Sequence, residues 1–317
     1  MPSALRPFRI DLLLLLVAGA WGSTYLTTKV LIIGDAVIAL LASRMLLAGA
    51  IMGVFVALRR KRLTRSELLN GVFLGIVLAG VFACETFGIA GTSATNAGLI
   101  ISLTMVFTPI LESALSRRRL PTTFFFAAIV AVAGVALLTG NGAFKPLGLG
   151  DLLILAAALV RAVNVTFIHK LTSGKPIDSL HLTTVQLATC AVLFTGTSLF
   201  AGKPIPHYLA QLNLSSWLAF LYLVVMCTVC AFFIQTWAIR RTSPSRVSLL
   251  LGTEPLWAAA IGITIAHDSF APIGYVGLLL VLVGTAWGRS VEQKHRSLRP
   301  NQPSARALTH ADERSPH

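Results

Sequence analysis

The chain has 317 residues, 55% of them hydrophobic and only 12% charged, with a mean hydropathy of +0.79. Soluble domains carry about twice that share of charged residues, so the composition excludes an ordinary globular protein and predicts one embedded in a lipid bilayer. The net charge of +14 does not indicate a nucleic-acid partner, because most Lys and Arg residues stand in short clusters between apolar runs.

The first apolar run begins like a secretory signal. Arg6 and Arg9 precede the apolar stretch 12–17, and the small residues 18–20 offer a cleavage site. The apolar stretch nevertheless continues through Tyr25, and a similar stretch recurs later in the chain, where no signal can be. We therefore interpret residues 8–29 as a retained first membrane helix.

Nine further apolar segments of membrane-spanning length follow in chain order. They lie at 36–57, 68–90, 94–116, 122–140, 150–171, 179–200, 215–238, 244–266 and 271–288. The sequence thus predicts an all-α integral membrane protein with ten transmembrane helices. The first five occupy residues 8–140 and the second five residues 150–289, while the basic segment 290–317 is predicted to be a disordered cytoplasmic tail.

The basic clusters predict the orientation of these helices. An even number of helices places both termini on one side, and an inside N-terminus gives the inner loops these clusters: Arg59 to Arg62 with Arg65, Arg117 to Arg119, Lys170 with Lys175, and Arg240, Arg241 and Arg246. The outer loops then keep only Lys29, Lys145 and Lys203. The positive-inside rule therefore predicts a multi-pass protein of the bacterial inner membrane with both termini in the cytoplasm.

The two halves of the chain are related by an internal repeat. Aligning residues 11–13 with 151–153 carries Trp21 onto Arg161 and Thr24 onto Asn164. Further on, Phe82, Glu85, Thr86 and Ile89 meet Phe232, Gln235, Thr236 and Ile239. Because each repeat has five helices, an odd number, the second must enter the membrane upside down. Inverted repeats are typical of alternating-access carriers.

At these residues the chain resembles the drug/metabolite transporter superfamily and, within it, the ten-helix EamA family. The resemblance covers residues 8 to about 289 and is carried by Trp21 to Thr24, Arg44, Thr92 to Ala97, Leu103 with Thr104, Thr242 to Ser245, and Glu254 with Pro255. The chain departs from the family pattern at Met105, where a proline is usual, and at Arg117 to Arg119, which replace a Gly-Glu-Arg pattern. In the second half the corresponding acid is Asp268.

The resemblance implies a secondary transporter that works without ATP hydrolysis. It favours export of a small polar metabolite, an amino acid or an amino-acid-derived compound such as an opine-like metallophore. The alternatives are a channel, or an uptake carrier for another small organic solute such as a nucleoside or an organic cation. The oligomeric state is left open.

Four ionisable residues at membrane depth are the leading candidates for the transport site, because such residues are costly to insert and are commonly functional. Arg44 and Arg161 would attract a substrate carboxylate, whereas Glu254 and Glu85 would take an amino group or a coupling proton. The alternative is an internal ion pair, for instance Arg44 with Glu85, which holds helices together without touching substrate.

Two helix faces and two prolines add further candidates. Trp21, Tyr25 and Lys29 are spaced four apart and share one face of the first helix, as Arg161 and Asn164 do in the equivalent helix. Such stripes either line a cavity or pack helices together. Pro109 and Pro255 are predicted to break corresponding segments, and broken membrane helices often mark binding sites.

The sequence carries no pattern for enzyme chemistry, a cofactor or a metal. HExxH and the phosphate-binding lysine loop are both missing, so we expect neither a metalloprotease nor an ATP-driven pump. Cys84, Cys190, Cys227 and Cys230 all lie in apolar segments and are expected to be buried thiols.

Overall fold

A computed structural model describes residues 5–59, 61–116, 120–140, 147–172, 175–201, 204–239, 250–269 and 271–297. Every regular element in these ranges is helical, as the composition predicts. Several of the predicted features lie outside the described residues: Arg60, Arg117 to Arg119, Lys145, Lys203, Arg240, Arg241, Arg246, the Thr242 to Ser245 motif, and residues 298–317.

The helices follow the predicted apolar segments. Those of the first half are α1 (Leu5–Leu31), α2 (Val37–Arg59), α3 (Arg65–Ala90), α4 (Ala94–Ile101), α5 (Thr104–Ser116) and α6 (Thr122–Gly140). Those described in the second half are α7 (Leu149–Thr172), α8 (Ser179–Phe200), α9 (Ile205–Ala210), α10 (Leu214–Val224), the π-helix η1 (Val225–Cys230), α11 (Ala231–Ile239), α13 (Glu254–Thr264) and α14 (Pro272–Ser297). The last of these continues beyond the expected boundary at residue 289, because residues 290–297 include good helix formers.

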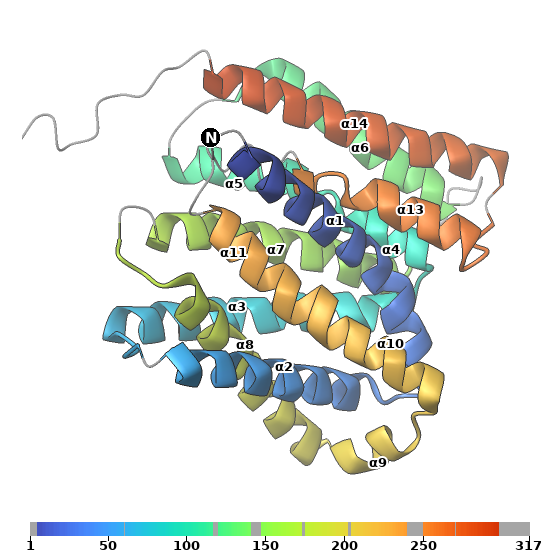
Figure 1. Ribbon diagram of the computed structural model, residues 1–317. Coiled ribbons are helices and arrows are strands. Elements are labelled where there is room, and N and C mark those ends of the chain that lie inside the picture. The colour runs from blue at the N-terminus through green and yellow to red at the C-terminus, as the bar shows by residue number, and fades with distance from the viewer. Residues whose placement is uncertain are drawn as a thin grey trace, which may run out of the picture.

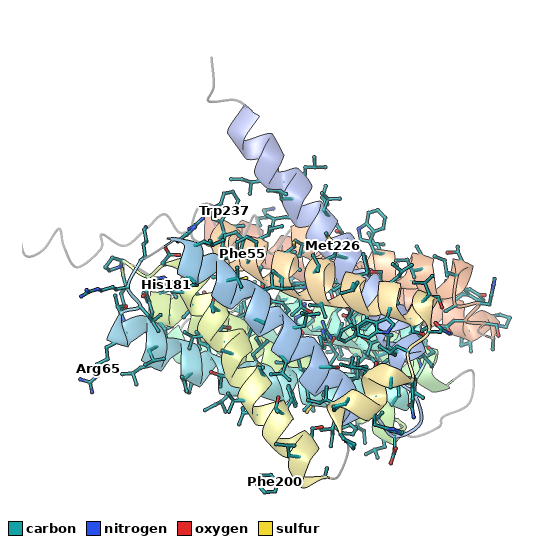
Figure 2. The ribbon with its side chains drawn as sticks, turned by 60° about the horizontal axis from the view of Figure 1, so that its bottom comes forward. Phe55, Arg65, His181, Phe200, Met226 and Trp237 are labelled. Atoms are coloured by element: carbon teal, nitrogen blue, oxygen red, sulfur yellow. The ribbon has the colours of Figure 1, made fainter. Side chains whose placement is uncertain are left out.

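Length and composition make this a multi-pass membrane protein. Seven helical stretches among the described residues, 22 to 26 residues long, are apolar enough to cross a bilayer, and Thr122–Leu137 and Pro272–Gly288 are shorter apolar helices. Large apolar side chains also point away from the bundle, among them Phe55, Phe200 and Met226 (Figure 2). Such an outer surface suits lipid rather than water.

Two membrane segments are broken, and at equivalent places in the two halves. Ser102 and Leu103 form a turn between α4 and α5, and Gly252 and Thr253 form a turn immediately before α13. These positions are 150 residues apart, which is also the offset that aligns Glu85 with Gln235.

The two prolines differ in their relation to these breaks. Pro255 follows its break directly, at the second residue of α13. Pro109 lies inside α5, which runs through it, so the prediction that Pro109 interrupts the segment is wrong. Proline removes only one backbone N–H, and the remaining bonds of the helix on either side are compatible with its ring geometry when the helix bends slightly.

Helices that the repeat aligns pack against one another. In Figure 1, α6 and α14 lie side by side along one edge of the bundle, and α2 and α8 lie together toward the opposite edge. The first pair approaches closely because Gly134 faces the backbone of Val281, and Gly284 faces the backbone of Ala131. Between these pairs, α1 packs on α13 and α3 packs on α7, so helices of both halves meet in the centre.

Candidate functional site

A small cavity lies in the centre of the bundle, where helices of both halves meet. It is lined by Trp21, Thr24, Tyr25, Arg44, Leu78, Val81, Phe82, Glu85, Arg161, Asn164, Val165, Phe232, Gln235 and Glu254. The space open to the centres of water-sized molecules is about 30 Å³, enough for about two waters. The described conformation is therefore closed around its own side chains.

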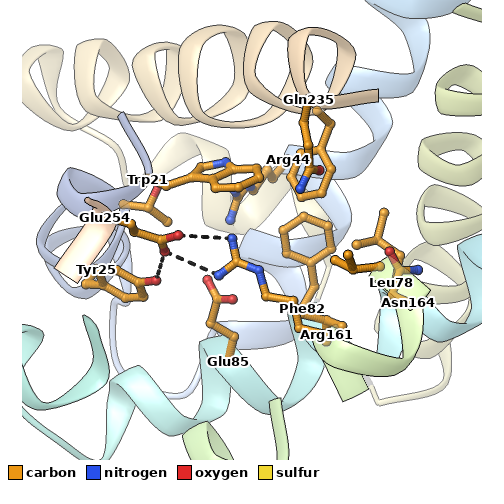
Figure 3. A pocket seen from close by; sticks show the side chains of 14 residues that line it. Trp21, Tyr25, Arg44, Leu78, Phe82, Glu85, Arg161, Asn164, Gln235 and Glu254 are labelled. Carbon is orange, nitrogen blue, oxygen red and sulfur yellow. Dashed lines mark hydrogen bonds and ion pairs between the residues drawn. The ribbon is translucent and has the colours of Figure 1, made fainter. Parts of the chain in front are cut away.

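An ion pair between Arg161 of α7 and Glu254 of α13 occupies one side of this cavity (Figure 3). It is bidentate: Nη1 of Arg161 donates to Oε1 of Glu254 at 3.2 Å, and Nη2 donates to Oε2 at 3.3 Å. The side chains are 16% and 9% exposed, so both charges are largely removed from solvent. An internal ion pair, which was the alternative to a substrate-binding role, is therefore present, but it joins Arg161 with Glu254 and not Arg44 with Glu85.

Two aromatic residues of α1 cover the ion pair from the other half of the chain. The ring of Trp21 lies 4.6 Å from the guanidinium carbon of Arg161, which is a cation–π distance. The hydroxyl of Tyr25 donates to Oε1 of Glu254. Trp21 is fixed in turn by its indole N–H, which donates to the carbonyl of Cys227 in η1 at 3.1 Å. Both residues thus line the cavity and contact the ion pair.

Arg44 is held separately on another side of the cavity. Its Nε donates to the hydroxyl of Thr228 at 2.8 Å, and its guanidinium carbon lies 4.9 Å from the ring of Phe82. The hydroxyl of Thr228 itself donates to the carbonyl of Leu223, five residues earlier and near the end of α10. The π-helix thus positions the partners of both Arg44 and Trp21, which agrees with the frequent occurrence of such turns at functional sites.

Glu85 reaches into the same cavity from α3, and its carboxylate lies near the Arg161 side chain in Figure 3. None of the ion pairs found among the described residues involves Glu85 or Arg44. The cavity is thus lined by two cations and two anions, of which one cation and one anion form a direct pair.

The other predicted residues divide between the cavity and the surface. Asn164 lines the cavity and donates from Nδ2 to the carbonyl of Leu74 at 3.1 Å, which ties α7 to α3. Lys29 does not line it. Its ammonium group donates to the carbonyl of Thr92, on the exposed end of α1. Lys29 lies two helical turns beyond Trp21, so a shared helix face does not bring it to the cavity.

The repeat accounts for most of the lining. The aligned pairs Trp21 with Arg161 and Thr24 with Asn164 all line the cavity, as do Phe82 with Phe232 and Glu85 with Gln235. Phe82, Phe232 and Gln235 were not among the candidate residues. The signal that could have found them was their alignment with residues of the other half, since a site between two repeats is lined by equivalent positions of both.

A second buried polar cluster lies at the end of the bundle where α3 and α8 begin. Oε2 of Glu67 lies 3.0 Å from Nδ1 of His181, and both side chains are 3% exposed. The other carboxylate oxygen accepts the backbone N–H of Asp178 at 2.7 Å. Glu67 also completes a capping box with Thr64 at the start of α3. This cluster fastens one half of the chain to the other.

Polar contacts also join the halves near the opposite end of α3. Asp268 accepts hydrogen bonds from the backbone N–H and the hydroxyl of Thr95, near the start of α4. Asp151 accepts from the hydroxyl of Thr92 at 2.5 Å. Polar contacts thus join the two halves of the chain on both sides of the central cavity, in agreement with its small volume. Among the described residues no group of three or more His, Cys, Asp or Glu side chains is arranged to hold a metal ion.

A cavity with buried charges of both signs, set between long apolar helices, is characteristic of a membrane transport pathway. The chain belongs to the EamA-like transporter family, whose sequence profile matches residues 8–140 and 148–287. The two matched segments correspond to the two halves of the repeat.

Relatives in other organisms are also transporters by name. An uncharacterized transporter of Archaeoglobus fulgidus is 24% identical over 274 residues, which cover 86% of this chain and 83% of that protein. The uncharacterized inner membrane transporter YedA of Escherichia coli is 23% identical, over 83% of this chain and 84% of its own. UDP-xylose transporter 1 of Arabidopsis thaliana is 23% identical, over 68% and 61%.

A solved structure shares the fold. It is a crystal structure with 16% sequence identity and a TM-score of 0.62, and the match covers 90% of this chain and 98% of that chain.

Proposed function

We propose that this membrane transporter is a secondary-active carrier that exports a small zwitterionic metabolite, such as an amino acid or an amino-acid-derived compound. The observation that carries the proposal is the balanced lining of the cavity, with Arg44 and Arg161 facing Glu85 and Glu254. A solute with one carboxylate and one ammonium group offers an anion to the arginines and a cation to the glutamates.

Alternating access between two inverted repeats of five helices each, ten in all, is the mechanism we propose. The packing of aligned helices, α6 on α14 and α2 on α8, supports this symmetry, as do the equivalent breaks before α5 and α13. With the N-terminus in the cytoplasm, the cluster around Glu67 closes the inner end of the pathway and the contacts of Asp151 and Asp268 close the outer end.

A nucleotide sugar is a weaker candidate, although one relative is named a UDP-xylose transporter. A diphosphate needs a clamp of several unopposed cations. This cavity has only two arginines, its two glutamates equal them in number, and Arg161 is already engaged by Glu254.

Counterflow into proteoliposomes tests the proposal. Vesicles are preloaded with one unlabelled solute and then given a trace of the same solute in labelled form, with and without a pH gradient. The solutes compared are leucine, other zwitterions, an opine-like metallophore, a nucleoside, an organic cation and UDP-xylose. We expect saturable, trans-stimulated uptake for a member of the zwitterion group. Flux that does not saturate would instead indicate a channel, and counterflow restricted to another group would overturn the assignment of the substrate.

A further inference from the structure

We propose that Arg161 is the anchor for the substrate's carboxylate, and that Glu254 occupies this anchor whenever the carrier is empty. Loading is then an exchange of one carboxylate for another on the same guanidinium group. The identity of the incoming carboxylate rests on the proposed function, whereas the exchangeable anion site at Arg161 does not.

The geometry of the pair supports an exchange. Two parallel N–H groups facing two oxygens form the fork that arginine offers to any carboxylate, so Glu254 occupies the position that a substrate carboxylate would take. The two bonds, at 3.2 and 3.3 Å, are longer than the 2.7–2.9 Å or so usual for charge-assisted bonds. The internal carboxylate is therefore held less tightly than a free ligand of good geometry could be.

The backbone around Glu254 also allows its side chain to leave. Glu254 is the first residue of α13, it follows the turn at Gly252 and Thr253, and it precedes Pro255, which has no backbone N–H. The carbonyl of Thr253 accepts from the N–H of Leu256 at 3.0 Å, in a single tight turn, and only weakly from the N–H of Trp257, at 3.4 Å. This end of the helix is thus less firmly held than a helix interior.

After the exchange, neighbouring side chains can bind both the released Glu254 and the ammonium group of the substrate. Tyr25 already donates to Glu254, so that carboxylate keeps a donor when it leaves Arg161. The ammonium group of a zwitterion can then bind to the released Glu254, with Glu85 close by in the same cavity. A solute with an amine but no carboxylate would leave Glu254 on Arg161, and it is therefore expected to bind poorly.

Arg44 is not an equivalent anchor. Its Nε donates to Thr228 and its guanidinium group stacks on Phe82, and both partners are neutral. A carboxylate that bound to Arg44 would therefore not replace an internal one, so no exchange would take place there. Since no internal carboxylate competes there, removal of Glu254 should not expose a new anion site at Arg44.

Rescue by acetate tests the inference without any knowledge of the natural substrate. The variant Glu254→Ala removes the internal carboxylate and leaves space next to Arg161. We expect acetate to raise its melting temperature in a saturable manner by roughly 2 °C or more, because a ligand that binds only the folded protein stabilises it by mass action. Acetamide, which has the same shape and no charge, should not do so. The matched control is Glu254→Ala combined with Arg161→Gln, which should not respond to acetate.

A second variant covers the case in which Glu254→Ala does not fold. Glu254→Gln keeps the side-chain length and a partner for Tyr25, but frees Arg161 of its counter-charge. Calorimetric titration should show acetate binding at least roughly tenfold more tightly to this variant than to the unaltered protein, in which Glu254 competes. Equal affinity in the two proteins, or acetate rescue that persists without Arg161, would overturn the inference. Neither measurement involves transport, so a failure of counterflow alone would refute the proposed function and leave the anion site standing.

Discussion

Removal of either partner of the Arg161–Glu254 pair should destabilise the protein more than removal of both. Breaking a buried ion pair from one side usually costs about 3–5 kcal/mol, because the remaining charge is left without a partner. Arg161 keeps the ring of Trp21, worth about 1–2 kcal/mol when desolvated, so we expect Glu254→Gln to cost about 2–3 kcal/mol. Arg161→Met should cost about 3 kcal/mol, since it leaves Glu254 with the hydroxyl of Tyr25.

The double variant should recover much of this loss, because replacement of a buried pair by uncharged side chains is often close to neutral. The assay is equilibrium unfolding in mixed micelles of dodecylmaltoside and SDS, arranged as a double-mutant cycle, and we expect a coupling of about 4 kcal/mol, which leaves the double variant less destabilised than either single one. The matched control is the pair formed by Lys61 and Asp178, with 3.8 Å between Nζ and Oδ2 and a lysine side chain that is 68% exposed. Its cycle, with Lys61→Met and Asp178→Asn, should show a coupling below about 1 kcal/mol. If the two single losses in the central pair simply add, the ion pair does not stabilise the fold and the reasoning is refuted.

Three further predictions concern other parts of the bundle. Gly98→Ala should destabilise by about 2 kcal/mol, since a Cβ there would stand 2.2 Å from that of Ala258; thermal unfolding checks this, and an unchanged melting temperature contradicts it. Glu67→Gln should lower the free energy of unfolding by about 2 kcal/mol, because it weakens the contact with His181. Limited proteolysis should then cut the 61–64 segment sooner, whereas unaltered cleavage would exclude a role of Glu67 in joining the two halves. Trp21→Leu should lower counterflow severalfold by removing the ring over the arginine, while Trp21→Phe should retain most of it; equal activity of both variants would speak against the cation–π contact.

The sequence predicted the helical membrane fold because hydropathy reports how deep a residue lies in the bilayer. Most of the predicted segments differ from the observed helices by only a few residues, and α1 runs without interruption through the stretch that imitates a cleavage site. The interruptions were harder to predict. The break before α5 falls at Ser102 and Leu103, residues that are ordinary in helices, and not at Pro109, because the packing of neighbouring helices rather than local propensity decides where the chain departs from regularity.

Much of the candidate site could also be predicted. Seven of the eight side chains proposed for substrate binding or coupling line the cavity. What could not be predicted is which charges touch. Arg161 and Glu254 are 93 positions apart in the chain, and their contact depends on how α7 and α13 are rotated about their axes. Hydropathy gives depth but not rotation, so Arg44–Glu85 and Arg161–Glu254 were equally plausible pairs.

The balance of charge in the cavity has a consequence for the energy that can drive the carrier. When all four side chains are ionised, two arginines and two glutamates sum to zero, and neither the empty site nor a site loaded with a zwitterion then carries net charge. The membrane potential supplies about 2.3 kcal/mol per elementary charge per 100 mV, and it therefore does no work on such a cycle. Active export of a neutral zwitterion would therefore need a coupling ion, such as a proton carried by one of the two glutamates, whose charge lets the membrane potential act on the cycle.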